Sequence, residues 1–145
     1  MKAWVYDKSK SDERGVFITL QEAPVPKPGP DDVLLRVIKV SVCGTDESLF
    51  FGKHPGVLNG TIPGHEFFGE VVEVGKNVKD CPPGQLICGE SHYTVHGYSD
   101  EGIIGLWGPK DREEKYIKPV NGAYAEFVSM PQSCVRKIPM KVIQD

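Results

Sequence analysis

The sequence predicts a mainly β domain with an antiparallel, barrel-like arrangement and only short helices. Its apolar segments are short, rich in β-branched residues and separated by turn residues; the 145 residues include 16 glycines and 12 prolines. No segment requires a helix longer than about two turns, which favours a sheet-based architecture. A chain of this length is one domain of ordinary size and can bury its own hydrophobic core.

The first part of the chain predicts a hairpin, an extended connector and a long strand. Strands are expected from Lys2 to Tyr6 and from Val16 to Leu20, around a polar turn at residues 12–15. Four prolines between residues 23 and 30 disfavour helix and suit an extended connector. The next strand, Val33 to Val42, is rich in β-branched residues and carries charges that indicate one partly wet side.

A short helix is predicted from Thr45 to Phe51, where Thr45 or Asp46 can serve as the N-cap. Further strands are expected at residues 66–74, 85–88 and 123–130. The stretch from Gly89 to Asn121 contains several glycines and a charged run, and it predicts a long surface loop. The alternative is a substrate-cleft lid or an oligomer contact, because loops this long are uncommon without a function.

Charge and cysteine content exclude several classes of function. The formal net charge of −3 gives no indication of the positively charged surface that a nucleic-acid-binding protein needs. No apolar run approaches the roughly 20 residues needed to span a bilayer, and the N-terminus lacks the apolar core of a signal peptide. Four scattered cysteines do not read as a disulfide framework. We therefore expect a cytoplasmic protein with reduced thiols and with neither nucleic acid nor membrane as a partner.

Two short motifs offer the ligands of a metal site: Cys43-Gly44-Thr45-Asp46 and Gly64-His65-Glu66. Cys43, His65 and Glu66 supply sulfur, imidazole nitrogen and carboxylate oxygen, the ligand types of a catalytic zinc site with one open position. A structural zinc site would use paired cysteines, and the chain has no C-x-x-C. The alternatives are a buried cysteine in a turn, a helix cap at Asp46 and a buried salt bridge at Glu66.

These motifs carry a resemblance to a known family. C-G-T-D followed by G-H-E and the strand-like Phe67 to Gly75 resembles the zinc-dependent alcohol dehydrogenases of the medium-chain dehydrogenase/reductase superfamily. Gly122 to Val128 is similar to the family's late strand, so the resemblance covers nearly the whole chain. It implies a GroES-like, partly open β-barrel over residues 1–145, the catalytic zinc and substrate domain. In its motifs the chain is most similar to threonine and polyol dehydrogenases.

The resemblance also implies a chemistry. Cys43, His65 and Glu66 would bind Zn²⁺, although in some relatives the carboxylate matching Glu66 does not reach the metal. Thr45 matches the proton-relay hydroxyl, and Ser48 occupies the next relay position, where some relatives have histidine. The full-length enzyme would transfer hydride from a zinc-bound secondary alcohol to NAD or NADP and would form a homo-oligomer. The stretch from Gly89 to Asn121 lacks the four cysteines with which many relatives bind a second, structural zinc.

A nucleotide-binding segment is not recognisable. A Rossmann domain requires G-x-G-x-x-G after a strand, and the nearest match, Gly102-x-x-Gly105-x-x-Gly108, has the wrong spacing. We therefore expect residues 1–145 to be a catalytic domain without its cofactor-binding domain, inactive in isolation, and the cofactor-binding residues are unknown. Two alternatives remain open: a zinc-free quinone reductase of the same superfamily, and a freestanding GroES-like binding module without catalysis.

Overall fold

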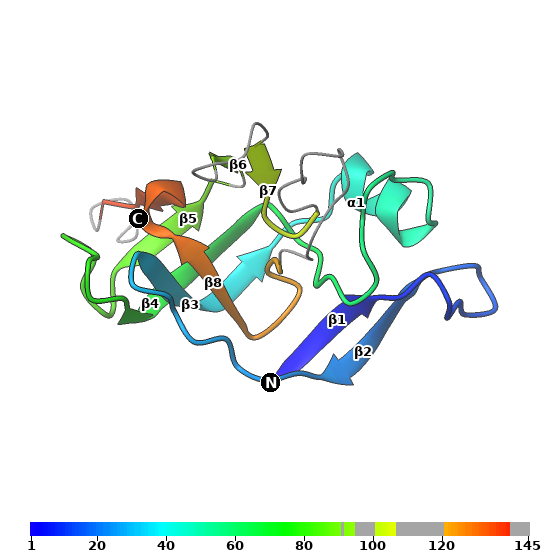
Figure 1. Cartoon of the computed structure of the whole chain (residues 1–145), viewed down its shortest axis with the longest axis horizontal. Coiled ribbons are helices and arrows are strands. Elements are labelled where there is room, and N and C mark those ends of the chain that lie inside the picture. The colour runs from blue at the N-terminus through cyan, green and yellow to red at the C-terminus, as the bar shows by residue number, and fades with distance from the viewer. Residues whose placement is uncertain (91, 95–100, 107–120, 140–145) are drawn as a thin grey trace.

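Over the residues that the structure describes, the chain folds as a mainly β structure with one α-helix, and Figure 1 shows the arrangement of its elements. The computed structural model describes residues 1–90, 92–94, 101–106 and 121–139. The elements are β1 (Lys2–Tyr6), β2 (Ile18–Glu22), β3 (Asp32–Val40), α1 (Gly44–Phe50), β4 (Phe67–Val74), β5 (Leu86–Gly89), β6 (His92–Thr94), β7 (Glu101–Ile103), β8 (Phe127–Pro131), η1 (Gln132–Cys134) and β9 (Val135–Lys137). None of the helices in these ranges has the length and apolar character needed to cross a membrane.

A five-stranded antiparallel sheet forms the centre of the molecule, with strand order β8-β3-β4-β5-β9. Two smaller sheets, β1-β2 and β6-β7, flank it. The edge strands β8 and β9 do not pair with each other, so the central sheet is open and does not close into a complete barrel. The predicted fold class, a mainly β structure with a partly open barrel-like sheet and short helices, is confirmed.

The main core lies on one face of the central sheet, where apolar side chains from four strands meet. Val33 and Leu35 of β3 pack with Val71, Ile87 and Val128, each at most 1% exposed. The register shift between Leu34 and Leu35 is a bulge in β4, where Val72 is the extra residue, and β4 exposes the consecutive residues Val72 and Glu73 there. On the opposite face Arg36 forms an ion pair with Glu70, the partly wet side that the sequence indicates.

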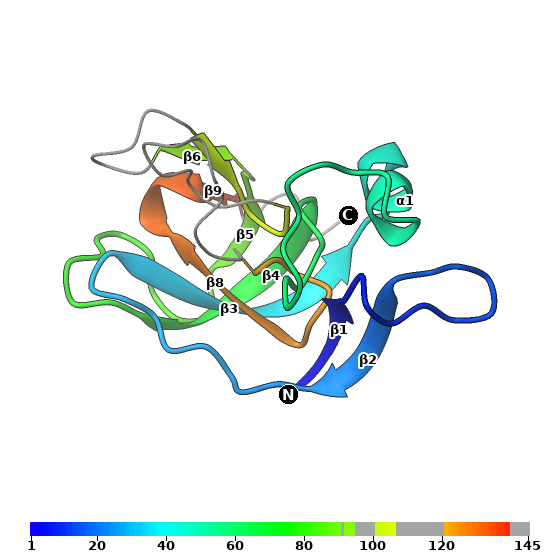
Figure 2. The same cartoon turned by 45° about the vertical axis from the view of Figure 1, so that its right-hand side comes forward.

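The N-terminal hairpin matches the prediction closely. β1 has the expected bounds, and the turn closes where Gly15, at φ +76°, donates its N–H to the carbonyl of Asp12. β2 begins two residues later than expected, because the backbone of Phe17 bonds Asp7 and Phe50 instead of β1. In Figure 2 the hairpin projects from one side of the central sheet, below α1.

The late strand is shorter than the sequence predicts. It was expected from residue 123, but β8 begins at Phe127. The backbone before it makes other hydrogen bonds: Ala123 and Tyr124 donate to the carbonyls of Gly64 and Pro63, and the carbonyl of Tyr124 accepts from Trp4 of β1. Residues 122–126 therefore connect the N-terminal hairpin to the segment that carries His65.

The stretch from Gly89 to Asn121 is not only a surface loop, so that interpretation was partly wrong. β6 pairs with β7 in an antiparallel ladder, and Ile104 and Leu106 are 1% and 2% exposed. Ile104 joins the main core, while Leu106 packs with Tyr6 and Leu49. The alternative for this stretch, a substrate-cleft lid or an oligomer contact, stays untested, because residues 91, 95–100 and 107–120 lie outside the described residues.

Candidate metal centre

The first half of the site lies between the end of β3 and the start of α1. Cys43 occupies the N-cap position in extended conformation, and its N–H donates to Oδ2 of Asp46 at 3.0 Å. The expectation that Thr45 or Asp46 would be the N-cap was therefore wrong by position, although Asp46 does satisfy an orphan donor of the helix start. Asp46 and Leu49 are fully buried on the inner side of α1. Thr45 and Ser48 are half-buried and three positions apart, which makes them neighbours on the helix surface.

The second half of the site is the buried segment 61–65, which three glycines hold in place. Gly64 adopts φ +95°, and Gly105 and Gly122 pack directly against its backbone. A Cβ on Gly105 would lie 2.7 Å from the carbonyl oxygen of Gly64, and a Cβ on Gly122 would lie 2.2 Å from it. Backbones approach this closely only where side chains are absent. This glycine junction (Gly64, Gly105 and Gly122) therefore fixes the backbone that leads into His65.

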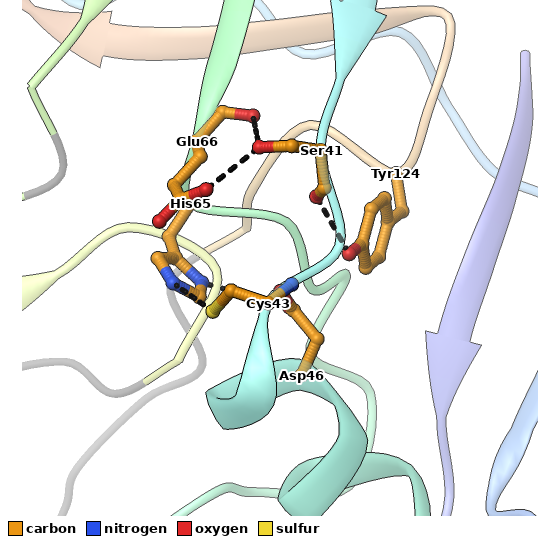
Figure 3. A network of polar contacts seen from close by, with 6 residues as sticks. All are labelled: Ser41, Cys43, Asp46, His65, Glu66 and Tyr124. Carbon is orange, nitrogen blue, oxygen red and sulfur yellow. Dashed lines mark hydrogen bonds and ion pairs between the residues drawn. The ribbon is translucent and has the colours of Figure 1, made fainter.

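The two halves bring Cys43 and His65 into contact, as Figure 3 shows. Cys43 Sγ lies 3.3 Å from His65 Nε2, although the two residues are 22 positions apart. On the other side of the ring, His65 Nδ1 lies 3.5 Å from Asp46 Oδ1. Both of these atoms are buried and have no other hydrogen-bond partner among the described residues. Cys43, Asp46 and His65 are, in the described part of the chain, the group of three potential ligands whose atoms lie within 4.8 Å of one another.

Electrostatics couple the histidine and the aspartate. The hydrogen bond to Asp46 raises the pKa of His65, and this effect outweighs burial, which lowers it. Burial raises the pKa of Asp46, but the contacts with His65 and with the Cys43 N–H together hold that pKa below its usual value. Asp46 is therefore an anion that orients the His65 ring through Nδ1. A carboxylate on this nitrogen leaves Nε2, the nitrogen beside the Cys43 sulfur, as the one available to a metal.

The donor atoms fit a zinc ion. Thiolate sulfur and imidazole nitrogen are common Zn²⁺ ligands, and a metal-bound histidine usually gives its other N–H to a carboxylate or carbonyl. Asp46, which is fully buried, supplies such a carboxylate. The chain also buries little polar side-chain material elsewhere: in the described ranges, Asp46, Thr61 and His65 are the buried polar or charged residues. Two of these three belong to the site, which is the pattern of a functional centre and not of a core.

Glu66 points elsewhere. Its carboxylate is exposed and accepts a 2.7 Å hydrogen bond from the Ser41 hydroxyl, and it is not part of the Cys43, Asp46 and His65 group. Ser41 in turn accepts a 3.0 Å hydrogen bond at its carbonyl from Tyr124. Burial raises the pKa of Tyr124 strongly, so its hydroxyl stays protonated and can donate. The metal role of Glu66 stays a prediction.

Sequence reasoning missed Ser41 and Tyr124 as parts of this network. Neither lies in a ligand motif, and only the alternation around Tyr124 indicated an inward-facing side chain. The proton-relay roles of Thr45 and Ser48 also stay predictions.

A cleft of about 510 Å³ opens beside the centre and is lined by Lys39, Ser41, His65, Glu66, Phe67, Phe68, Cys88, Gly89 and Glu90. The site is therefore reachable from solvent on the side of β4 and β5.

Comparison with known proteins agrees with this geometry. Residues 29–140 match the family model of the alcohol dehydrogenase GroES-like domain. The L-threonine 3-dehydrogenase of Ruegeria pomeroyi is 33% identical to the chain over 145 residues. That alignment covers 92% of this chain and 39% of the relative, so the chain spans about two fifths of the length of the protein it matches.

Solved structures extend the similarity to the fold. A zinc-binding dehydrogenase from Sinorhizobium meliloti 1021, solved with NADP bound, superimposes with a TM-score of 0.77 at 28% identity, covering 97% of this chain and 39% of that one. The alcohol dehydrogenase of Thermus sp. ATN1 gives a TM-score of 0.73 at 30% identity, covering 96% and 40%. The arrangement of a cysteine sulfur, an imidazole and a carboxylate beside the start of α1 and the match over residues 29–140 point the same way. The chain belongs to the zinc-type alcohol dehydrogenase family, of which it carries the GroES-like domain.

Proposed function

We propose that residues 1–145 form the zinc- and substrate-binding domain of a dehydrogenase that oxidises a small secondary alcohol. The observation that carries the proposal is the 3.3 Å contact between Cys43 Sγ and His65 Nε2, with Asp46 on the opposite ring nitrogen. Cys43 and His65 would hold the ion, and Asp46 would keep the His65 ring in the tautomer that binds through Nε2. When bound, zinc supplies a Lewis acid that stabilises negative charge on the substrate oxygen.

Two hydroxyl groups of α1 would handle the proton of the substrate alcohol. Thr45 lies in the first turn of the helix, two residues beyond Cys43, and would accept the proton as the substrate is oxidised. Ser48, one turn further on, would pass it towards solvent. A serine hydroxyl conducts protons but does not titrate near neutral pH, so this relay adds no ionisation of its own to the pH profile.

The substrate class that we favour is an amino alcohol such as L-threonine. The relative from Ruegeria pomeroyi carries the name L-threonine 3-dehydrogenase. The cleft beside the centre also offers both signs of charge to a zwitterion, with Lys39 for a carboxylate and Glu66 for an ammonium group. The hydride acceptor would be NAD or NADP, bound by a segment outside residues 1–145, since one similar structure was solved with NADP.

Metal titration of the chain tests the proposal directly. We expect Cys43→Ser and His65→Ala to weaken Zn²⁺ binding by more than the roughly 10–100-fold that loss of an outer hydrogen-bond partner costs. The affinity should also fall at lower pH, because protons compete for imidazole and thiolate. His54→Ala is the matched control, since His54 lies in the loop after α1, is half-buried and is not part of the Cys43, Asp46 and His65 group. Zinc binding that survives both ligand variants would place the metal elsewhere and refute the proposal.

A further inference from the structure

The residue next to His65 is held by a hydrogen bond that leads away from the metal centre. Glu66 and His65 are adjacent, but His65 is buried beside Cys43 while the Glu66 carboxylate reaches the Ser41 hydroxyl at 2.7 Å (Figure 3). The Glu66 carboxylate cannot approach the centre without first giving up its contact with Ser41.

Ser41 is itself fixed at three points. Its N–H donates to the Glu66 carbonyl at 2.9 Å, and its hydroxyl lies 3.3 Å from the same carbonyl oxygen. Its own carbonyl accepts the 3.0 Å hydrogen bond from the hydroxyl of Tyr124. Ser41 therefore ties the segment before Cys43 to the segment after His65, and the two ligand-bearing parts of the chain cannot shift independently.

Tyr124 anchors this arrangement from the interior. It is 8% exposed, and its ring packs against Phe50 of α1 with a centroid distance of 5.9 Å. Its backbone N–H donates to Pro63 at 2.9 Å, and its ring fills the space beside the Cα of Gly64. The Tyr124 hydroxyl thus sits on a rigid support, which lets it define the position of the Ser41 carbonyl.

We propose that Ser41 is a positioning residue that holds the Glu66 carboxylate away from the metal, and that Tyr124 fixes Ser41 for this role. The inference rests on the proposed function, because it assumes a metal between Cys43 and His65. On this proposal, the Ser41 hydroxyl decides how many ligands the metal has. With Ser41 in place Glu66 faces the cleft and is available to substrate, and without Ser41 it becomes a further oxygen ligand.

Cobalt substitution separates these states, because the d–d absorption of Co²⁺ reports the ligand number and a thiolate charge-transfer band reports Cys43. We expect Glu66→Gln to leave both features of the wild-type chain unchanged. Ser41→Ala should shift the d–d bands and lower the Kd for Co²⁺ by roughly tenfold, a change of the size seen when groups around a metal site are altered. The double variant Ser41→Ala/Glu66→Gln should return to the wild-type spectrum, and Ser41→Thr, which keeps the hydroxyl, should resemble wild type.

Tyr124→Phe should shift the d–d bands in the same direction as Ser41→Ala but by less, because Ser41 keeps its backbone bond to Glu66. Tyr6→Phe is the control, since Tyr6 is a buried tyrosine that packs on Phe17. A wild-type spectrum in Ser41→Ala, a shift that persists in the double variant, or a changed spectrum in Glu66→Gln alone would each overturn the inference. Absence of the thiolate band from the wild-type chain would instead refute the metal proposal, and this inference with it.

Discussion

Gly105→Ala tests whether the glycine junction holds the His65 segment. A Cβ at residue 105 would lie 2.7 Å from the carbonyl oxygen and 2.9 Å from the nitrogen of Gly64, both backbone atoms that cannot rotate away. The φ of +74° at Gly105 adds a left-handed conformational cost of about 1–2 kcal/mol for alanine. Overpacking typically costs about 1–3 kcal/mol more, so the free energy of unfolding should fall by about 2–5 kcal/mol.

Gly15→Ala is the matched control, because Gly15 has nearly the same φ, +76°, and nothing within 4 Å of the added Cβ. It carries the conformational cost alone, so the difference between the two variants isolates the contact with Gly64. In urea unfolding followed by circular dichroism, we expect Gly105→Ala to lose about 1–3 kcal/mol more than Gly15→Ala. Its melting temperature should be lower by about 3–10 °C relative to the control.

The metal provides a second measurement on the same pair. Because Gly64 directly precedes His65, Gly105→Ala should also weaken Co²⁺ binding, while Gly15→Ala should leave it unchanged. Equal destabilisation of the two variants, within about 0.5 kcal/mol, would refute the docking of Gly105 on Gly64. Greater destabilisation with an unchanged Co²⁺ affinity would show that the junction stabilises the fold without positioning His65.

Two further predictions concern ionisation. In chelator-treated protein, the contact of His65 with Asp46 raises the pKa of His65, so this contact stabilises the fold fully below pH about 6.5 and is lost as pH rises through the raised pKa. The free energy of unfolding of wild type should therefore exceed that of His65→Gln by more at pH 6 than at pH 8.5. A difference that does not change with pH would contradict the pairing. Burial raises the pKa of Cys81 and Cys134, so an alkylating reagent at pH 7.5 should modify exposed Cys88 first and reach the two buried thiols at the rate of unfolding, with mass spectrometry of digested fragments as the readout.

Local patterns predicted the N-terminal hairpin because its strands pair across one short connection in the sequence. The bounds of β1 and the turn ending at Gly15 follow from a polar turn between two apolar runs. The strand expected from residue 123 has an alternating pattern, but tertiary contacts with Pro63 and Gly64 take the backbone of Ala123 and Tyr124. Such competition is invisible in a window of ten residues, because it depends on a segment far away in the sequence.

For the candidate centre, the sequence predicted that Cys43 and His65 belong to one site, and the structure brings them together, but the residues that support them were not predicted. Cys43 and His65 are residue types with metal chemistry, and their motifs place each beside further polar groups. Tyr124 and Ser41 have ordinary side chains whose role arises only from where the backbone brings them. Gly105 was noticed only as part of a failed nucleotide motif, while its actual role is close backbone packing.

The pairing of β1 with residues 124–126 has a consequence for synthesis of the chain. The N–H of Lys2 and the carboxylate of Glu126 are 124 positions apart, and Trp4 and Tyr124 share a backbone hydrogen bond. At about 5–20 residues per second, the partner segment emerges about 6–25 s after β1. The hairpin of β1 and β2 can form within about 10 μs, yet the part of its second edge between Lys2 and Trp4 stays unpaired for that whole interval. During translation, this edge is therefore a template on which neighbouring nascent chains can pair.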